Sequence, residues 1–273
     1  MSRGVIMGVL NVTPDSFSDG GLYLEKPDAV AAGREMIAQG AGIIDVGGES
    51  TRPGASPVPV DEELRRVIPV IEALAAEGVV VSVDTSKPVV ARAAFEAGAE
   101  IVNDVTAASV EGMTEVMGEW RPGVILMHMR GTPRTMQQDP VYQDVVAEVA
   151  LFLVDRAQRV IGAGVDPASV AIDPGIGFGK TVRHNLELID GLGRLTGHGF
   201  PVVLGASRKS FLGRLTGIED PGSRDQATAV STALGFERGA RVFRVHDVAS
   251  SLAALRLAAA IVTPQQWDEW SQD

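Results

Sequence analysis

The chain has 273 residues, 45% hydrophobic and only 5% aromatic, so a large aliphatic core can form, and no run approaches the roughly 18 uncharged apolar residues that cross a bilayer. A net charge of −11, from 24 Lys and Arg against 35 Asp and Glu, disfavours nucleic acid and anionic membrane surfaces as partners, because phosphate backbones need a basic footprint. The absence of cysteine excludes disulfides, thiol nucleophiles and thiolate metal sites, and it favours a hard ion such as Mg²⁺ for any metal that the protein uses.

The sequence begins directly with a strand-like run and shows no signal pattern, so we expect a cytoplasmic protein. From there, short β-branched runs alternate with longer stretches that have apolar residues at spacings of three and four. The pattern predicts strands at residues 4–12, 42–48, 79–84, 100–105, 123–128, 170–175, 201–207 and 241–248. Between and after them it predicts helices at residues 28–39, 61–77, 88–97, 110–118, 141–162, 183–188, 223–238 and 248–261.

Strand and helix therefore alternate along the whole chain. Eight β–α units of this length favour a closed (β/α)8 TIM barrel of the α/β class over the main alternative, a doubly wound open sheet. Such a barrel typically takes about 250 residues, and no linker or low-complexity run divides this chain. We predict a single barrel domain over residues 1–273.

Every predicted strand carries a polar residue at or near its end. In a barrel the functional groups come from the carboxyl ends of the strands and the loops after them, so these side chains would meet at one mouth. A single Asp in such a place is usually a helix cap or turn former, but a converging ring of carboxylates and amides costs desolvation unless it meets a ligand. The ring comprises Asn11, Asp45, Asp84, Asn103, Asp104, His128, Asp173, Ser207, Arg244 and His246.

A basic cluster stands out in this acidic chain. It comprises Arg52, Arg208, Lys209, Arg244 and His246. Some of these residues could simply be solvated, yet the loops after strands seven and eight are where barrels commonly bind phosphate. The backbone N–H groups of the helix that follows Ser207 would add positive potential. The cluster therefore predicts an anion site.

The loops after the first two predicted strands, at residues 13–21 and 49–57, are unusually long. Most such connections have about two to six residues, and these two mix Phe, Asp, Thr and Arg with Gly and Pro. Ordinary connections are one interpretation. We favour lids that close over a substrate.

Seven segments, taken in this order, resemble the dihydropteroate synthases. They are NVTPDSFSDGG at 11–21, IDVGGESTRPGA at 44–55, SVDT at 82–85, MHM at 127–129, DPGIGFGK at 173–180, SRKS at 207–210 and RVHD at 244–247. The resemblance implies a transferase of folate biosynthesis that joins 6-hydroxymethyl-7,8-dihydropterin diphosphate to 4-aminobenzoate and releases diphosphate. It also implies a sulfonamide target and a homodimer, for which the helix from residue 223 and the Ala- and Leu-rich helix at 250–261 could supply the face.

Carried over by position, the resemblance implies a pterin site formed by Asp84, Asn103 and Asp173, with Lys209 on the carbonyl and N5 side of the ring. The chemistry fits, because a carboxylate can accept bidentately from the guanidine-like edge of a pterin and an amide can both donate and accept. Met127 and Phe178 would line the pterin slot, although a role as plain core is equally open for these two residues.

The same resemblance implies that Asn11 holds Mg²⁺ and that Thr51, Arg244 and His246 meet the diphosphate. The leaving group departs from a benzylic-like CH₂, so dissociative substitution is the natural hypothesis, and the charge that builds on the diphosphate needs stabilisation. We expect catalytic roles for Arg244, His246 and Lys209, and for Asp19, which would face the cation.

The 4-aminobenzoate pocket would comprise Phe17, Arg52, Pro53 and Ser210 once the two loops close. The neutral arylamine needs positioning more than deprotonation, so we expect no general base. Asp45, Asp104 and His128 are left without an assigned ligand.

Two rival interpretations remain at this point. A corrinoid-linked pterin methyltransferase would share the barrel and the pterin carboxylates, but it would need no diphosphate site. A non-catalytic barrel that binds pterin or phosphate would bind its ligand without releasing diphosphate.

Overall fold

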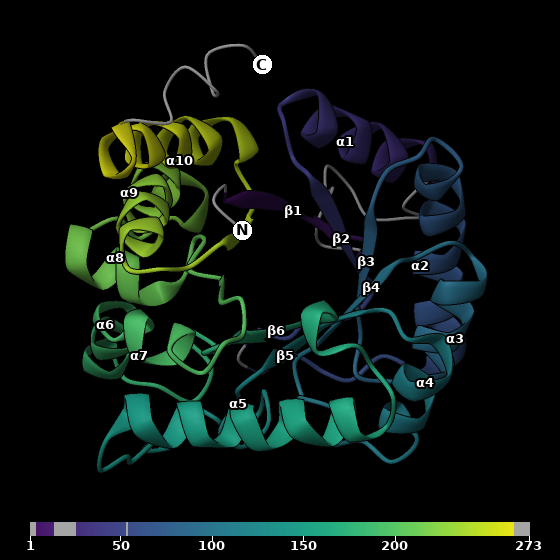
Figure 1. Ribbon diagram of the computed structural model, residues 1–273. Helices are drawn as coiled ribbons and strands as arrows, with labels where there is room; N and C mark the ends of the chain where they lie inside the picture. Colours follow the sequence, from purple (N-terminus) through teal and green to yellow (C-terminus); the bar gives the residue numbers. More distant parts are fainter. Residues whose placement is uncertain (1–3, 14–25, 53, 265–273) are drawn as a thin grey trace.

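The computed structural model describes residues 4–13, 26–52 and 54–264, and it is a ring of parallel strands inside a ring of helices (Figure 1). The strands are β1 Val5–Asn11, β2 Ile43–Gly47, β3 Val81–Asp84, β4 Ile101–Asp104, β5 Gly123–Met127, β6 Val170–Asp173, β7 Val203–Leu204 and β8 Val242–Val245. The helices are α1 Lys26–Ala38, α2 Val60–Ala75, α3 Pro88–Glu96, α4 Met113–Trp120, α5 Val145–Gly162, α6 Val182–Asp190, α7 Leu192–Thr196, α8 Ser210–Thr216, α9 Asp225–Glu237 and α10 Val248–Val262, with 3₁₀ turns at Pro167–Ser169 and Pro221–Arg224.

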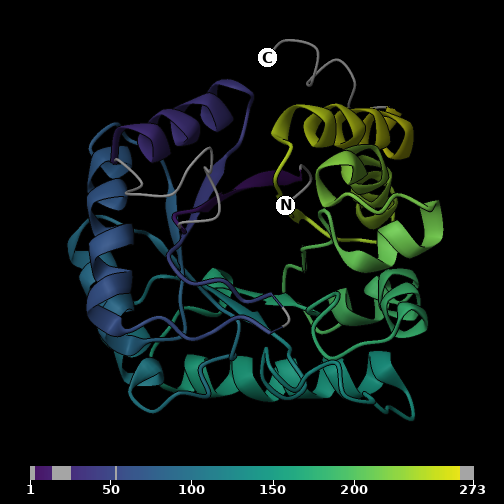
Figure 2. The ribbon, with the colours of Figure 1, turned by 180° about the vertical axis from the view of Figure 1, so that it is seen from behind.

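All eight strands are parallel, in the order β6-β5-β4-β3-β2-β1-β8-β7. A single parallel bridge between Ile172 and Val202 joins the two ends of this sheet, and the view from behind shows the helices all around it (Figure 2). The predicted (β/α)8 TIM barrel is therefore confirmed.

The closing strand is shorter than predicted. We expected residues 201–207, but β7 pairs with β8 only over Val203–Leu204. Gly205 follows at once, and glycine is a poor strand residue because it has no side chain to pack. The chain leaves the sheet there, beside Asp173 and Arg244.

Apolar side chains fill both sides of the strands, as buried parallel strands require. A small cluster formed by Met7, Ile125, Val203 and Val242 is separate from the large cluster that joins strands to helices. The strands are thus fixed from both faces, and their carboxyl ends are held at one rim.

Helix boundaries follow local capping. The fifth helix begins at Val145 rather than at residue 141, because the Asp144 carboxylate accepts a hydrogen bond of 2.9 Å from the backbone N–H of Ala147. The short helix α7 was not predicted, whereas α8 is the helix expected after Ser207. Among the described residues, no helix combines the length and apolar character needed to span a membrane.

Candidate active site

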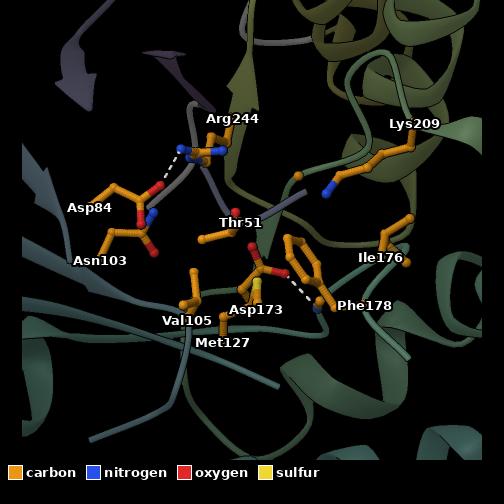
Figure 3. Close-up of a pocket in the computed structure, with 12 residues that line it drawn as sticks. Thr51, Asp84, Asn103, Val105, Met127, Asp173, Ile176, Phe178, Lys209 and Arg244 are labelled. Carbon is orange, nitrogen blue, oxygen red and sulfur yellow. Dashed lines mark hydrogen bonds and ion pairs between the residues drawn. The ribbon is translucent and has the colours of Figure 1, made fainter. Parts of the chain in front are cut away.

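A pocket lies at the carboxyl ends of the strands (Figure 3). Parallel strands end at the same rim, so residues distant in sequence meet there. Eight of its lining residues were singled out in the sequence, namely Thr51, Asp84, Asn103, Met127, Asp173, Phe178, Lys209 and Arg244. Four were not, namely Val105, Gly175, Ile176 and Gly205, although Gly175 and Ile176 belong to the DPGIGFGK segment.

The Arg244 guanidinium is the centre of the polar network. Its Nε donates to Asp45 Oδ2 and its Nη2 donates to Asp84 Oδ2, each at 2.6 Å. Burial opposes the charge of Arg244, but the Asp45 and Asp84 carboxylates raise its pKa above the ordinary arginine value. Arg244 therefore stays charged, and its Nη1 has no hydrogen-bond partner among the described residues.

Asp45, left unassigned by the sequence, positions two pocket residues at once. Besides Arg244, its Oδ2 accepts from Asn103 Nδ2 at 3.0 Å, and the whole side chain is buried. This bond fixes the Asn103 amide and leaves its Oδ1 and second N–H for a ligand. Next to it, burial raises the pKa of Asp84 to about 7, against the lowering effect of Arg244.

Asp173 is oriented by the tight loop after β6. Its Oδ1 accepts a hydrogen bond of 2.6 Å from the backbone N–H of Gly175. Gly175 has φ +67°, and a Cβ there would lie 1.9 Å from the His128 carbonyl oxygen, so the loop requires glycine. Burial raises the pKa of Asp173.

The Lys209 ammonium lies over the Phe178 ring, with Nζ 3.8 Å from the centroid. Figure 3 shows this amine directed into the pocket, with Arg244 and Asp84 on the opposite wall. Burial and the nearby Arg244 charge lower the pKa of Lys209 to about 7. A cation that is easily neutralised thus faces the ligand space.

This depressed pKa predicts a pH-dependent stability. The pKa of Lys209 is about 7 in the folded protein, against 10.5 for an ordinary lysine. Between these two pH values folding releases a proton, so stability rises with pH. Below about pH 7 the buried charge of Lys209 lowers the free energy of unfolding by its full amount. Lys209→Met should therefore unfold at higher urea than wild type at pH 6.5. The gap should shrink as pH rises from about 7 to 10.5. A gap that stays constant over this window would contradict the assignment.

Other candidates lie around the rim. Asn11 ends β1 and is half-buried, and a Cβ on Gly47 would lie 3.7 Å from Asn11 Oδ1 and 3.6 Å from Asp84 Oδ2. His246 follows β8, the neighbour of β1. Arg52 and Ser210 are exposed. Phe17, Asp19 and Pro53 lie outside the described residues.

Arg208 does not join the anion cluster. Its guanidinium donates to the Asp225 carboxylate at 2.6 and 2.7 Å, and its backbone adopts φ +58°. The helix after it begins only at Ser210. The basic side chains that line the pocket are therefore Lys209 and Arg244, whereas Arg208 is paired with Asp225 and does not line it.

The remaining unassigned polar residues act structurally. Asp104 accepts from the backbone N–H groups of Thr106 at 2.7 Å and Ala108 at 2.8 Å, so it caps the turn after β4. His128 Nδ1 lies 3.0 Å from Lys180 Nζ, and Lys180 also donates to the Phe178 carbonyl oxygen at 2.9 Å. This contact links the loop after β6 to the end of β5.

A buried network holds the base of the loop after β2. Lys87 Nζ donates to the carboxylates of Glu49 and Glu63 and, at 2.8 Å, to the Val58 carbonyl oxygen. The Val58 N–H donates back to Glu49 at 3.1 Å, and the buried Glu63 accepts from Thr85 Oγ1 at 2.6 Å. The two ends of the loop that carries Thr51 and Arg52 are thus tied together by Lys87.

Comparison with known proteins assigns the family. The profile of the pterin binding enzymes matches residues 7–246. The dihydropteroate synthase of Mycobacterium leprae is 48% identical over 262 residues, covering 93% of this chain and 92% of that protein.

Solved structures agree with this similarity. The Xanthomonas albilineans dihydropteroate synthase with 4-aminobenzoic acid superposes with a TM-score of 0.90 at 48% identity, over 95% of this chain and 93% of that one. The same enzyme with 7,8-dihydropteroate has a TM-score of 0.87 and 46% identity, over 95% of this chain and 94% of that one. The Yersinia pestis enzyme with a sulfonamide drug has a TM-score of 0.91 and 40% identity, over 95% of this chain and 94% of that one. The chain therefore belongs to the pterin binding enzyme family, as one of its dihydropteroate synthases, which are transferases of folate biosynthesis.

Proposed function

We propose that this chain joins 6-hydroxymethyl-7,8-dihydropterin diphosphate to 4-aminobenzoate, with Asp84, Asn103, Asp173 and Lys209 around the pterin. One observation carries the proposal, namely the pocket in which carboxylates, an amide and two cations converge. A few convergent polar groups in an otherwise apolar pocket are typical of small-molecule sites. The solved relatives with 4-aminobenzoic acid and 7,8-dihydropteroate support the choice of substrates.

Pterin recognition follows from the hydrogen-bonding groups. The Asp173 carboxylate accepts from the guanidine-like edge of the ring, and the fixed Asn103 amide adds a donor and an acceptor. Lys209 donates to the carbonyl and N5 side. Met127 and Phe178, which pack in one cluster with Val105, enclose the flat ring.

Stabilisation of the leaving group falls to Arg244 and His246, with Thr51 at the pocket wall. Breaking the C–O bond moves an electron pair onto the diphosphate, and fixed cations and donors lower the energy of that charge. Arg244 is held by two carboxylates through Nε and Nη2, so Nη1 is the guanidinium nitrogen that meets the ligand. The pterin and diphosphate halves of the site are therefore coupled through this one side chain.

The residues at the end of β1 fit a magnesium ion that arrives with the diphosphate. Mg²⁺ usually takes one or two protein oxygens and completes its shell with phosphate oxygens and water, and Asn11 offers one amide oxygen. No group of three His, Asp or Glu side chains within the described parts of the chain could hold a metal ion by itself. When bound, the ion neutralises charge on the diphosphate.

The 4-aminobenzoate site lies toward Arg52 and Ser210, together with Phe17 and Pro53, and Asp19 faces the cation. Arg52 supplies a charge for the carboxylate, and Ser210 supplies a hydroxyl. This half of the site depends on the loop whose base Lys87 ties together.

Lys87→Met tests that dependence. Loss of the ammonium leaves the buried Glu63 without its cation, so the free energy of unfolding should fall by about 3 kcal/mol. The KM for 4-aminobenzoate should rise while the Kd for pterin diphosphate stays near wild type. Urea denaturation and steady-state kinetics measure the two effects, and Arg92→Met, at an exposed ion pair on the next helix, is the matched control. An equal weakening of both substrates would count against a specific effect on the loop.

Diphosphate release with and without 4-aminobenzoate and Mg²⁺ tests the proposed reaction. We expect release that requires both, with 7,8-dihydropteroate as the product. Methyl transfer without diphosphate release would instead favour the corrinoid-linked reaction, and binding without release would favour a non-catalytic barrel.

We also propose a homodimer through α9 and α10, which pack against each other. Large apolar side chains on these helices are exposed, including Val230, Leu257 and Ile261. Exposed apolar patches of this kind commonly mark an interface. Sedimentation should therefore give a dimer for wild type and a monomer for Leu257→Glu, with Leu151→Glu, an equally exposed leucine on α5, remaining dimeric.

A further inference from the structure

The Ser207 hydroxyl makes a paired contact with His246. Ser207 is buried just after β7, and its Oγ accepts a hydrogen bond of 3.2 Å from the backbone N–H of His246. The same Oγ lies 2.9 Å from Nδ1 of the His246 ring. A backbone N–H can only donate, so one acceptor position of this hydroxyl is already taken.

Only one tautomer of the His246 imidazole gives both the Ser207 hydroxyl and the ring Nδ1 a hydrogen-bond partner. If the imidazole carried its proton on Nδ1, the hydroxyl would accept twice, and its own buried hydrogen would have no acceptor among the described residues. If the proton is on Nε2, the hydroxyl donates to Nδ1, so the hydroxyl and Nδ1 are both paired, and Nε2–H is left for a ligand. The contact therefore selects the Nε2–H form.

Burial, together with the charges around the ring, keeps the His246 imidazole neutral, so the position of its single proton matters. Burial, followed by the positive charges of Arg244, Arg208, Lys209 and Arg52, lowers the pKa of His246 to about 3. A neutral imidazole has one N–H, and the Ser207 contact assigns it to Nε2.

The backbone around Ser207 is held firmly enough for this task. Arg208 adopts φ +58°, an uncommon conformation for a residue other than glycine. Its backbone N–H donates to Thr228 Oγ1 at 3.1 Å, and its carbonyl oxygen accepts from Arg224 at 3.0 Å. Such conformations persist where the surroundings over-determine them, often at functional sites.

We propose that Ser207 is a positioning residue that holds His246 as the neutral Nε2–H tautomer, so that the ring presents a single donor to the leaving diphosphate. The proposal rests on the proposed function of His246 in meeting that diphosphate. A neutral N–H donor can stabilise the negative charge that builds on the leaving oxygen. It does so without adding a third cation beside Lys209 and Arg244.

Long-range ¹H–¹⁵N spectra of the ¹⁵N-histidine protein test the tautomer directly. The chain has four histidines, and His246→Gln identifies the resonance. We expect a pyridine-type Nδ1 and a pyrrole-type Nε2 in wild type, and a mixture of tautomers in Ser207→Ala. A wild-type ring protonated on Nδ1, or identical spectra for the two proteins, would overturn the proposal.

Kinetics give a second test. Ser207→Ala should lower kcat on the order of 10- to 100-fold, by analogy with the loss of partners that orient metal-binding histidines, with little change in the KM for 4-aminobenzoate. Ser207→Thr, which keeps the hydroxyl, should have most of the wild-type kcat. Ser251→Ala removes another fully buried hydroxyl, one without a hydrogen-bond partner in the described part of the chain, and should keep wild-type kcat. Full activity in Ser207→Ala would contradict the proposal.

Titration with inorganic diphosphate separates this inference from the proposed function. A wild-type Nε2–H ring whose signals do not move with diphosphate would refute the contact between His246 and the leaving group, but not the role of Ser207 in setting the tautomer. A ring that responds to diphosphate while protonated on Nδ1 would refute the role of Ser207 alone. If Ser207→Ala does not fold, the wild-type spectrum still decides the question, because a wild-type ring protonated on Nδ1 overturns the proposal.

Discussion

Arg244→Met is expected to lower kcat/KM by about 10²- to 10³-fold, the loss seen when a fixed group that stabilises transition-state charge is removed. It should also destabilise the fold. The fully buried Asp45 and the nearly buried Asp84 would lose the cation that bridges them, and removing one partner of such a buried group costs about 3–5 kcal/mol. Diphosphate release and urea denaturation measure the two effects.

Two further variants separate catalysis from folding. Arg244→Lys keeps a charge but not the planar fork that reaches two carboxylates, so it should recover part of the stability and little of the activity. Arg34→Met removes an arginine from an exposed ion pair with Glu77 and should leave both properties near wild type. Near-normal kcat/KM in folded Arg244→Met would refute its role at the leaving group.

Asp173→Asn is expected to raise the Kd for pterin diphosphate by roughly 100-fold. An amide keeps the shape of the side chain and can still accept from the Gly175 N–H, but its NH₂ opposes the donor pair of the pterin. Losing charge-assisted hydrogen bonds in a buried site costs about 3 kcal/mol. Calorimetric titration measures the affinity.

Asp104→Asn is the matched control, because Asp104 is also a buried Asp at a strand end. Its carboxylate caps a turn instead of facing the pocket, so the variant should lose stability but keep the wild-type Kd. Equal affinities for Asp173→Asn and wild type would exclude Asp173 from the pterin site.

Alternation along a strand is a signal in the sequence that separates two neighbouring polar residues of the site. Asn103 and Asp104 are neighbours, and successive residues of a strand point to opposite faces. Asn103 lines the pocket while Asp104 caps a turn. The period of two would have separated them in advance, but their roles were assigned from the resemblance, which named only Asn103.

The directions of neighbouring side chains in a turn, unlike those in a strand, cannot be read from the sequence pattern. Arg208 and Lys209 share charge and position in the sequence, and both were placed in one anion cluster. Only the backbone at φ +58° and the Asp225 carboxylate, 17 residues away, direct Arg208 away from the pocket. Turn geometry depends on such partners, so sequence pattern could not distinguish the two.

The sequence by itself determined the parallel barrel, since alternating apolar runs of strand and helix length allow few other ways to bury both faces of each strand. It also determined which polar residues reach the rim, because parallel strands place their carboxyl ends together. The single-domain boundary stays a prediction. The tertiary structure alone decided how those polar groups pair: Asp45 holds Arg244 across 199 residues, and Ser207 meets His246 across 39. Hydrogen bonds of this kind depend on distances of a few tenths of an ångström, which only the packed core sets.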